Sequence, residues 1–232
     1  MTKIYLIPTV IADNTESNVI TDQVKHVIKG LDFFLVENVR TARRYISKLR
    51  LGLVIEDLHF EVLDKKTKPE VIEKYFAQAG NKNIGIISES GCPGIADPGA
   101  AAVAVAHRKG LRVIPLSGPS SIFLALMGSG FNGQSFAFHG YLPIDKKERE
   151  KKIKILEESA SRLYQTQIFM DTPYRNQKLF EHLLSACLPN TQLSVAKGIT
   201  GDEEFIKTMT IREWKKESIN LHKTPTIFCL YS

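Results

Sequence analysis

The chain is 232 residues long, a length that fits one large domain or two small ones. Its hydrophobic content of 43% and charged content of 24% are typical of a folded globular protein and exclude an intrinsically disordered chain. The net charge of +6 suits an anionic partner such as RNA, although many enzymes without such a partner are equally basic.

The cysteines and the apolar runs indicate in which cellular compartment the protein is expected. Cys92, Cys187 and Cys229 lie far apart and form no Cys-x-x-Cys pair, so neither a zinc site nor a disulfide framework is predicted. The apolar segment that ends at Pro8 is too short for a signal peptide. No run approaches the roughly 18 apolar residues that a transmembrane helix needs. We therefore expect a cytoplasmic protein that does not span a membrane.

Strand-like and helix-like patterns alternate along the first half of the chain. Strands are predicted at residues 4–7, 33–36, 84–87 and 111–116, and helices at 19–29, 38–49, 69–80 and 98–108. Pro69 and Pro98 suit the first position of a helix, and Gly80 suits a helix end. The segment 52–64 has no clear pattern. The alternation predicts a parallel sheet with right-handed crossovers.

A second series begins after Ser117-Gly-Pro119, with a helix predicted at 120–127. Its strands are predicted at 136–140, 167–170, 193–196, 205–209 and 226–230. Helices separate the first of these strands, whereas the last strands follow one another closely, which is typical of a mixed sheet with antiparallel members. We predict two α/β domains, 1–117 and 118–232.

The loop 87–99, Ile-Ser-Glu-Ser-Gly-Cys-Pro-Gly-Ile-Ala-Asp-Pro-Gly, carries the strongest functional signal. Gly91 and Gly94 let the backbone approach a ligand closely because they lack a Cβ atom. Asp97 and Pro98 are typical of a helix start. The loop thus joins the carboxyl end of a strand to a helix, which is where open α/β sheets bind ligands. A tight connection without a ligand would use the same residue types.

Phosphate-binding motifs are missing from the sequence. It contains no Gly-x-x-x-x-Gly-Lys-Ser/Thr motif, and no Gly-x-Gly-x-x-Gly follows the first strand. The loop after Ile7 reads Pro-Thr-Val-Ile-Ala and has no glycine to hold a pyrophosphate. Nucleoside triphosphate chemistry is therefore disfavoured.

Short motifs along nearly the whole chain occur in a fixed order. They are Pro8-Thr9, the loop 88–99, Pro115-Leu-Ser-Gly-Pro-Ser-Ser121, Ser129-Gly-Phe131, Phe138-His-Gly-Tyr-Leu-Pro143, Thr172-Pro-Tyr-Arg175 and Pro225-Thr226. Together they resemble the tetrapyrrole methylase superfamily, and within it the branch of small-subunit ribosomal RNA (cytidine-2′-O)-methyltransferases. The blocks 87–99 and 115–143 are the most specific.

The resemblance implies two α/β domains, a homodimer, and S-adenosylmethionine held in a cleft between the domains. The cofactor-binding residues that it implies are Pro8, Ser90, Gly91, Cys92, Ile95, Ser120, Ser121, Met170 and Ile199. Apolar walls suit adenosine, and serine hydroxyls and NH groups at a helix start suit a carboxylate. Met170 is also typical of core packing, the serines of helix caps, and Cys92 of an inert apolar group.

The chain departs from the pattern of the ribosomal branch in two loops. The segment that follows residue 36 keeps Glu37 and Arg40 but has Asn38 in place of a second acid. The first loop reads Ile11-Ala-Asp-Asn14, where the branch has Ile-Gly-Asn-Leu. Both changes concern the substrate side more than the cofactor side.

Methyl transfer from a sulfonium is an in-line displacement, and orientation of the reactants can contribute on the order of 7–11 kcal/mol to its rate. A hydroxyl nucleophile also needs a proton acceptor. The first candidate is Glu37, the second is Asp171 and the third is His139, although each has an ordinary structural interpretation as a paired or buried group.

Basic and aromatic residues are candidates for substrate binding. Basic clusters occupy 40–50 and 146–154, and such runs are also typical of solvated helix faces. Aromatic rings for stacking on a base are Phe131, Tyr141 and Tyr174. The residues that we assign to substrate binding are Arg40, Arg43, Arg44, Tyr141 and Arg175.

These patterns predict an S-adenosylmethionine-dependent methyltransferase that acts on RNA, at a ribose hydroxyl or a base of ribosomal RNA. One alternative is methylation of a tetrapyrrole such as a precorrin, whose carboxylates the same lysines and arginines could bind. Another is a non-catalytic RNA-binding adaptor that retains the fold. No metal ion is predicted.

Overall fold

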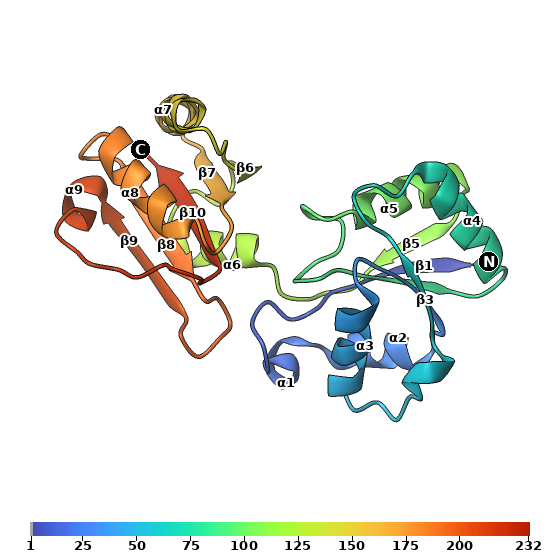
Figure 1. The fold of residues 1–232 in the computed structure, drawn as a ribbon. Helices are drawn as coiled ribbons and strands as arrows, with labels where there is room; N and C mark the ends of the chain where they lie inside the picture. Colours follow the sequence, from blue (N-terminus) through green and yellow to red (C-terminus); the bar gives the residue numbers. More distant parts are fainter. Residues whose placement is uncertain (1) are drawn as a thin grey trace. The chain divides into compact units, whose positions relative to one another are not determined.

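The computed structural model describes residues 2–232. The chain forms two compact units, Met1–Ser120 and Ser121–Ser232, and each is built on its own five-stranded sheet (Figure 1). We describe each unit by itself.

The sheet of the first unit is parallel throughout. Its strands are β1 (Lys3–Ile7), β2 (Phe33–Val36), β3 (His59–Val62), β4 (Ile84–Ile87) and β5 (Arg112–Pro115). They are arranged in the order β3-β2-β4-β1-β5, and every neighbouring pair is parallel. All residues of β2 and β4 are buried, as expected for central strands covered on both faces. The predicted parallel sheet is confirmed.

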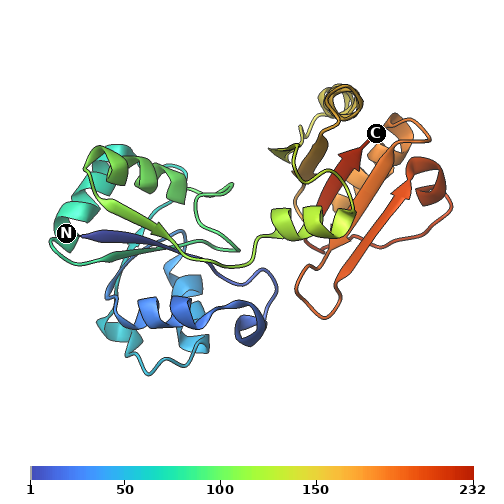
Figure 2. The same cartoon turned by 180° about the vertical axis from the view of Figure 1, so that it is seen from behind.

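Helices cover both faces of this sheet, as the views from the front and from behind show (Figures 1 and 2). They are α1 (Glu16–Val19), α2 (Asp22–Lys29), α3 (Val39–Lys48), the 3₁₀ helix η1 (Ile55–Asp57), α4 (Pro69–Ala79) and α5 (Gly99–Arg108). The helices α2 and α3 pack with Phe34 and Ile7 in one core cluster, whereas α4 and α5 pack with Leu35 and Ile4 in the other. The first unit is therefore a three-layer α/β structure.

Two segments of the first unit differ from the sequence-based prediction. The helix predicted at 19–29 starts later, at Asp22 as α2, because the Thr21 side chain accepts a hydrogen bond from Val24 N (3.3 Å) and caps it; Val19 ends the short α1 instead. The segment 52–64 contains β3, an edge strand of four residues. Its His59 and Glu61 are polar, so it lacks the apolar run that identifies the central strands.

The sheet of the second unit is mixed, as predicted. Its strands are β6 (Phe136–Tyr141), β7 (Thr166–Met170), β8 (Gln192–Lys197), β9 (Phe205–Thr210) and β10 (Thr226–Tyr231). The order is β6-β7-β10-β8-β9, in which β6 and β7 are parallel and every other pair is antiparallel.

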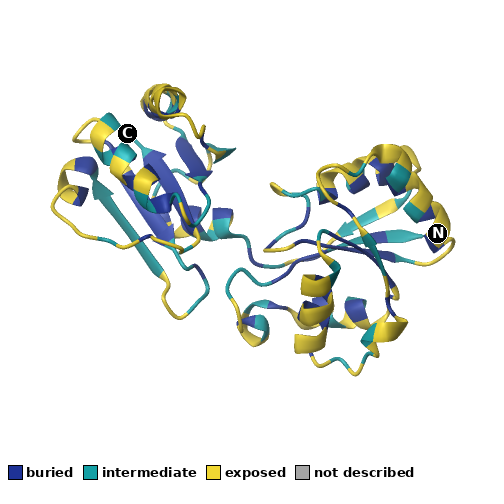
Figure 3. Ribbon diagram, in the orientation of Figure 1, coloured by how far each residue is buried: buried dark blue, intermediate teal, exposed yellow. Residues whose placement is uncertain are grey.

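The helices of the second unit lie on opposite faces of its sheet. One core cluster joins the sheet to α7 (Lys146–Leu163), α8 (Asn176–Ala186) and α9 (Ile211–Trp214), and the other joins it to α6 (Ser121–Ser129). Trp214 is fully buried in the first cluster, and its indole NH donates to Leu193 O (2.8 Å). Colouring by burial shows the strands at the centre of this sheet enclosed and the outer helix faces exposed (Figure 3).

The packing around Gly85 in β4 gives a test of the first core. A Cβ atom at this position would lie 2.7 Å from Phe34 Cδ1 and 2.8 Å from Ile7 Cδ1, and both side chains are fully buried. We expect Gly85→Ala to lower the free energy of unfolding by about 1–3 kcal/mol, the usual effect of overpacking, in urea unfolding followed by circular dichroism. The control is Gly133→Ala, because no atom lies within 4 Å of a Cβ there. Equal stability of the two variants would contradict the packing described.

Candidate functional site

Three loops of the first unit meet at the carboxyl edge of its sheet. They follow β1, β4 and β5, and because these strands are parallel and adjacent their carboxyl ends share one edge. Thr9 N donates to Gly91 O (2.9 Å), which ties the first loop to the second. The Tyr45 hydroxyl of α3 donates to Pro8 O (2.8 Å), and both residues are buried. The backbone at this edge is therefore fixed by contacts between distant segments.

Two glycines permit the closest approaches among these loops. A Cβ atom on Gly118 would lie 2.2 Å from Pro8 Cγ, and one on Gly91 would lie 3.2 Å from Pro119 O. Gly91 also has φ of +70°, which side chains rarely adopt. Only glycine fits at position 118 without displacing Pro8.

Cys92 lies at the same place, half-buried in the wall that these loops form. Its Sγ is 3.3 Å from Pro119 O, and burial raises the pKa of the thiol. The group is therefore a neutral thiol at physiological pH, which suits an apolar wall better than a nucleophile. The structure thus brings together Pro8, Gly91 and Cys92, three of the residues that the sequence assigns to the cofactor.

The loop between β4 and α5 is stabilised by hydrogen bonds among its own residues. The Ser88 hydroxyl donates to Gly91 O (2.8 Å), and Asp97 Oδ1 accepts from Gly94 N (2.7 Å) and Gly99 N (2.6 Å). The Asp97 carboxylate therefore stabilises the loop and the first residue of α5, although the N-cap position itself is occupied by Pro98, which makes no side-chain cap.

Two predicted cofactor residues of this loop, Ser90 and Ile95, have exposed side chains, and 51% of Ile95 is accessible to solvent.

Glu37 follows β2 and lies among carboxylates. Burial, the hydrogen bond and charge of Asp97 and the charge of Glu89 together raise its pKa to about 7, although a hydrogen bond from the backbone of Glu89 acts in the opposite direction. The Thr41 hydroxyl donates to the carboxylate of Glu89. Glu37 therefore changes its charge near neutral pH, whereas an isolated glutamate would be fully ionised there. The sequence identified Glu37 but not its partners, because their proximity depends on the pairing of β2 with β4.

In the second unit, residues of the candidate site lie on neighbouring strand ends. Tyr141 at the end of β6 pairs with Met170 at the end of β7, and Met170 in turn lies opposite Ile227 of β10. Tyr141 is 53% exposed, whereas Met170 packs in part against the α6 cluster that also contains Ile199. Ser121 begins α6, and Ser120 is the last residue of the first unit.

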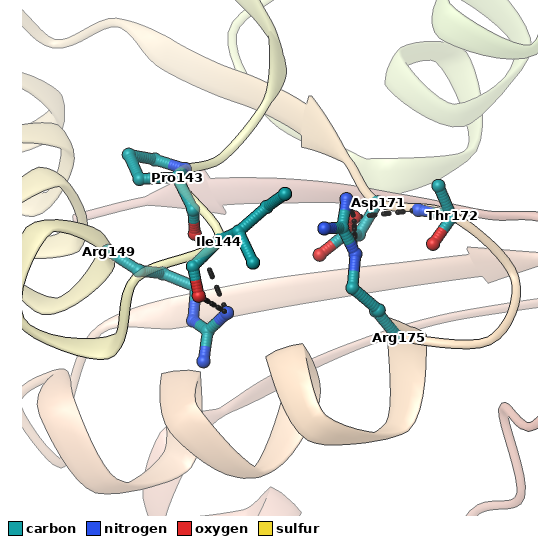
Figure 4. Close-up of polar contacts among 6 residues, drawn as sticks. All are labelled: Pro143, Ile144, Arg149, Asp171, Thr172 and Arg175. Carbon is teal, nitrogen blue, oxygen red and sulfur yellow. Dashed lines mark hydrogen bonds and ion pairs between the residues drawn. The ribbon is translucent and has the colours of Figure 1, made fainter.

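Asp171 follows Met170 and holds the guanidinium of Arg175 (Figure 4). Its Oδ1 accepts from Arg175 Nε (2.8 Å) and from Thr172 N (2.7 Å), and only 1% of its side chain is exposed. Within residues 2–232, its other oxygen has no hydrogen-bond partner. The Arg175 side chain is 28% exposed, so the pair presents part of an oriented guanidinium at the surface.

His139, the third candidate acceptor, lies on β6 with Nε2 2.7 Å from Gln167 Oε1. Burial lowers the pKa of His139 most and the charge of Lys152 lowers it too, whereas the hydrogen bond that the ring donates to Gln167 raises it. The imidazole is therefore neutral at pH 7.

The two basic clusters differ in how far their charges are neutralised. On α3 the side chains of Arg40, Arg43 and Arg44 are exposed, and the ion pairs found within residues 2–232 include none of them. The Arg43 guanidinium lies 5.5 Å from the centre of the Phe60 ring, a cation–π contact.

The cluster on α7 is partly paired. Lys151 and Lys154 form ion pairs with Glu148 and Glu150 on the same helix. Arg149 is buried and donates to Ile144 O (3.2 Å) and, more weakly, to Pro143 O (3.5 Å), so it holds the loop before α7 (Figure 4). Within residues 2–232, Lys48 of the first cluster pairs with Glu16, which leaves Arg40, Arg43, Arg44 and Arg50 exposed and outside the ion pairs. On α7 the cations outside the ion pairs are Lys146, Lys147 and Lys152, besides the buried Arg149.

Two kinds of feature are absent from the part of the chain that the structure describes. Residues 2–232 contain no group of three or more His, Cys, Asp or Glu side chains placed to bind a metal ion. No helix formed by these residues has the length and apolar content needed to cross a lipid bilayer.

Comparison with known proteins identifies relatives along almost the whole chain, although no family model matches it. It is 27% identical over 231 residues to "Ribosomal RNA small subunit methyltransferase I" of Vibrio cholerae, covering 98% of this chain and 76% of that protein. The protein of the same name from Halalkalibacterium halodurans is 28% identical over 222 residues, covering 93% and 71%. The Bacillus subtilis protein of that name is 29% identical over 205 residues, covering 88% and 66%.

Solved structures share the fold of both units. Diphthine synthase matches with a TM-score of 0.71 at 13% identity, covering 100% of this chain and 90% of that chain. The methyltransferase CobJ matches with a TM-score of 0.63 at 17% identity, covering 100% and 93%. The solved structures show the fold, and the curated relatives support the resemblance that the ordered motifs indicate: the chain is similar to the ribosomal RNA small subunit methyltransferase I proteins and has the fold of tetrapyrrole methylases.

Proposed function

We propose that the protein binds S-adenosylmethionine and transfers its methyl group to RNA, at a ribose hydroxyl or a base of ribosomal RNA. The observation that carries this proposal is the set of glycine-bearing loops fixed at the carboxyl edge of the first sheet. The names of the relatives supply the substrate class. By the same resemblance we propose a cytoplasmic homodimer, which light scattering would contradict if it gave the mass of one chain.

The residues present fit the proposed cofactor. Gly118 leaves no room for a Cβ atom beside Pro8, and Gly91 has a positive φ and lies close to Pro119 O. The neutral thiol of Cys92 and the exposed Ile95 offer apolar surface. Ser90, Ser120 and Ser121 would supply polar contacts, and Pro8, Met170 and Ile199 further walls. When bound, S-adenosylmethionine supplies an electrophilic methyl group on a sulfonium.

Glu37 is the better of the two acidic candidates for proton acceptor. With a pKa of about 7 it is available in its ionised form at neutral pH and can take up a proton from a hydroxyl nucleophile. The carboxylate of Asp171 is held by Arg175, so we assign it to positioning of that arginine. The guanidinium groups of Arg40, Arg43 and Arg44 would contact phosphates of the RNA.

The close approach of Gly118 to Pro8 predicts a selective effect on the cofactor. We expect Gly118→Ala to abolish the rise in melting temperature that S-adenosylmethionine or S-adenosylhomocysteine gives the unchanged protein, since the new methyl group displaces Pro8. A ligand at 100 times its Kd should stabilise the unchanged protein by about 2.7 kcal/mol. Gly133→Ala is the control and should keep this shift. If neither compound shifts the unchanged protein, the adaptor alternative is favoured instead.

The raised pKa of Glu37 predicts the pH dependence of the reaction. The methyl-transfer rate should increase as the pH rises through about 7, because the carboxylate is the active form, and then level off. Glu37→Gln should have a low rate without this step, whereas Glu56→Gln, at an exposed acid of the same unit, should behave like the unchanged protein.

Stability supplies a second readout for the same variant. Because the folded protein binds the proton of Glu37 more tightly than the unfolded chain does, this group contributes stability that is fully present below pH 4.5, its ordinary pKa. That contribution is lost as the pH rises through about 7. Glu37→Gln removes this loss, so its stability relative to the unchanged protein should be greater at pH 8 than at pH 5. An equal difference at both pH values would contradict the raised pKa.

The unpaired arginines of α3 predict salt-sensitive binding of RNA. We expect the double variant Arg40→Ala and Arg44→Ala to bind RNA more weakly, and to reduce the slope of log K against log salt by about one per arginine. The matched control is Arg108→Ala with Arg112→Ala, two exposed arginines at the opposite edge of the same sheet. If both double variants lose the same RNA affinity, the effect depends only on net charge and α3 is not part of the RNA-binding site.

A further inference from the structure

An aromatic ring near basic residues is exposed on the second unit. It is Tyr174, in the loop between β7 and α8, and it is 70% exposed. His222 lies edge-on to it, with 6.4 Å between the ring centres and 78° between the ring planes. We call Tyr174, Arg175, His222 and Lys223 the Tyr174 surface.

The backbone under this surface is fixed although the ring is exposed. Lys223 N donates to Pro173 O (3.0 Å), and the side-chain amide of Asn176 donates to Thr224 O (2.7 Å). Lys223 has φ of +59°, an unusual value for a residue other than glycine, which shows that the surrounding contacts hold it there. A ligand would therefore meet a ring and a lysine whose main chains are already in place, which reduces the entropy lost on binding.

The charges around the ring suit a polyanion. Asp171 orients the guanidinium of Arg175, which remains 28% exposed. Lys223 takes part in none of the ion pairs found within residues 2–232. The acidic residues 202–204 lie on the turn between β8 and β9. There Glu204 accepts a hydrogen bond from Thr200 N (2.7 Å). The residue after Tyr174 in the chain and the residue across the Pro173 contact are therefore basic, and the acids lie on a separate turn.

The Tyr174 surface lies at the same end of the second sheet as Tyr141 and Met170. Tyr174 lies in the loop that follows Met170, and Met170 pairs with Tyr141 at the same end of the sheet. Another equally exposed tyrosine, Tyr164, precedes β7 and so lies at the opposite end of that strand. Exposure alone therefore does not distinguish Tyr174, but its place in the sheet and its basic neighbours do.

We propose that the Tyr174 ring stacks on an unpaired base of the RNA substrate, while Arg175 and Lys223 contact the adjoining phosphates. This inference rests on the proposed function and adds to it that the RNA is single-stranded where it meets the second unit. Stacking on an aromatic ring requires a base that has left its helix, and cations beside the ring can follow the backbone.

The test compares the unchanged protein with the variants Tyr174→Ala, Tyr174→Phe and Tyr164→Ala. For each, binding of a short fluorescein-labelled single-stranded RNA is measured, and so is binding of the same RNA annealed to its complement. Tyr174→Ala should weaken binding of the single strand by about fivefold or more, the effect of losing one base-stacking contact. Tyr174→Phe keeps the ring and should bind within about twofold of the unchanged protein. Tyr164→Ala, the control of equal exposure, should also stay within about twofold. Duplex binding should be unaffected by all three substitutions.

The possible outcomes separate this inference from the proposed function. If the unchanged protein binds the single strand and Tyr174→Ala binds it equally well, the stacking role is wrong and the proposed function stands. Equal losses in Tyr174→Phe and Tyr174→Ala would also overturn stacking, since the hydroxyl would then be the important group. If the unchanged protein responds to S-adenosylmethionine but binds neither RNA, both the inference and the RNA substrate are wrong. A retained thermal shift with S-adenosylmethionine in every variant shows that the fold is intact.

Discussion

The close packing of three loops at one edge of a parallel sheet is the constraint on which the first unit's site depends. Parallel pairing of β1 with β4 and β5 brings the residues after each strand to the same edge. There the chain approaches itself so closely that position 118 has no room for a Cβ atom beside Pro8. Such an approach gives a surface of backbone and small side chains, which can follow the outline of a ligand more closely than longer side chains could.

Electrostatics gives the acids of the two units different properties. Glu37 is partly buried and lies near other carboxylates, so its proton is held more tightly and its charge changes near neutral pH. Asp171 is buried against an arginine instead, and its carboxylate fixes the direction of that guanidinium. One environment favours proton uptake, and the other favours rigid presentation of a cation. The sequence alone treats both residues simply as carboxylates at strand ends.

Much of the fold could be predicted because its signals are local. Uninterrupted apolar runs identified β2 and β4, and the turn-rich loop after β4 together with the ordered motifs indicated the resemblance that the curated relatives support. The edge strand β3 could not be identified, since its residues are partly polar and only pairing with β2 defines it. The partners of Glu37, the exclusion of side chains at Gly118 and the contact between Tyr174 and His222 join residues far apart in the chain, and no local pattern reports them.

The most direct test of the central claim is transfer of a labelled methyl group from S-adenosylmethionine to RNA by the purified protein. Ribosomal RNA in its small subunit and a precorrin would be offered separately, each as the sole acceptor. The account predicts that label enters the RNA and not the tetrapyrrole. Label in the precorrin alone, or in neither acceptor despite binding of the cofactor, would contradict it.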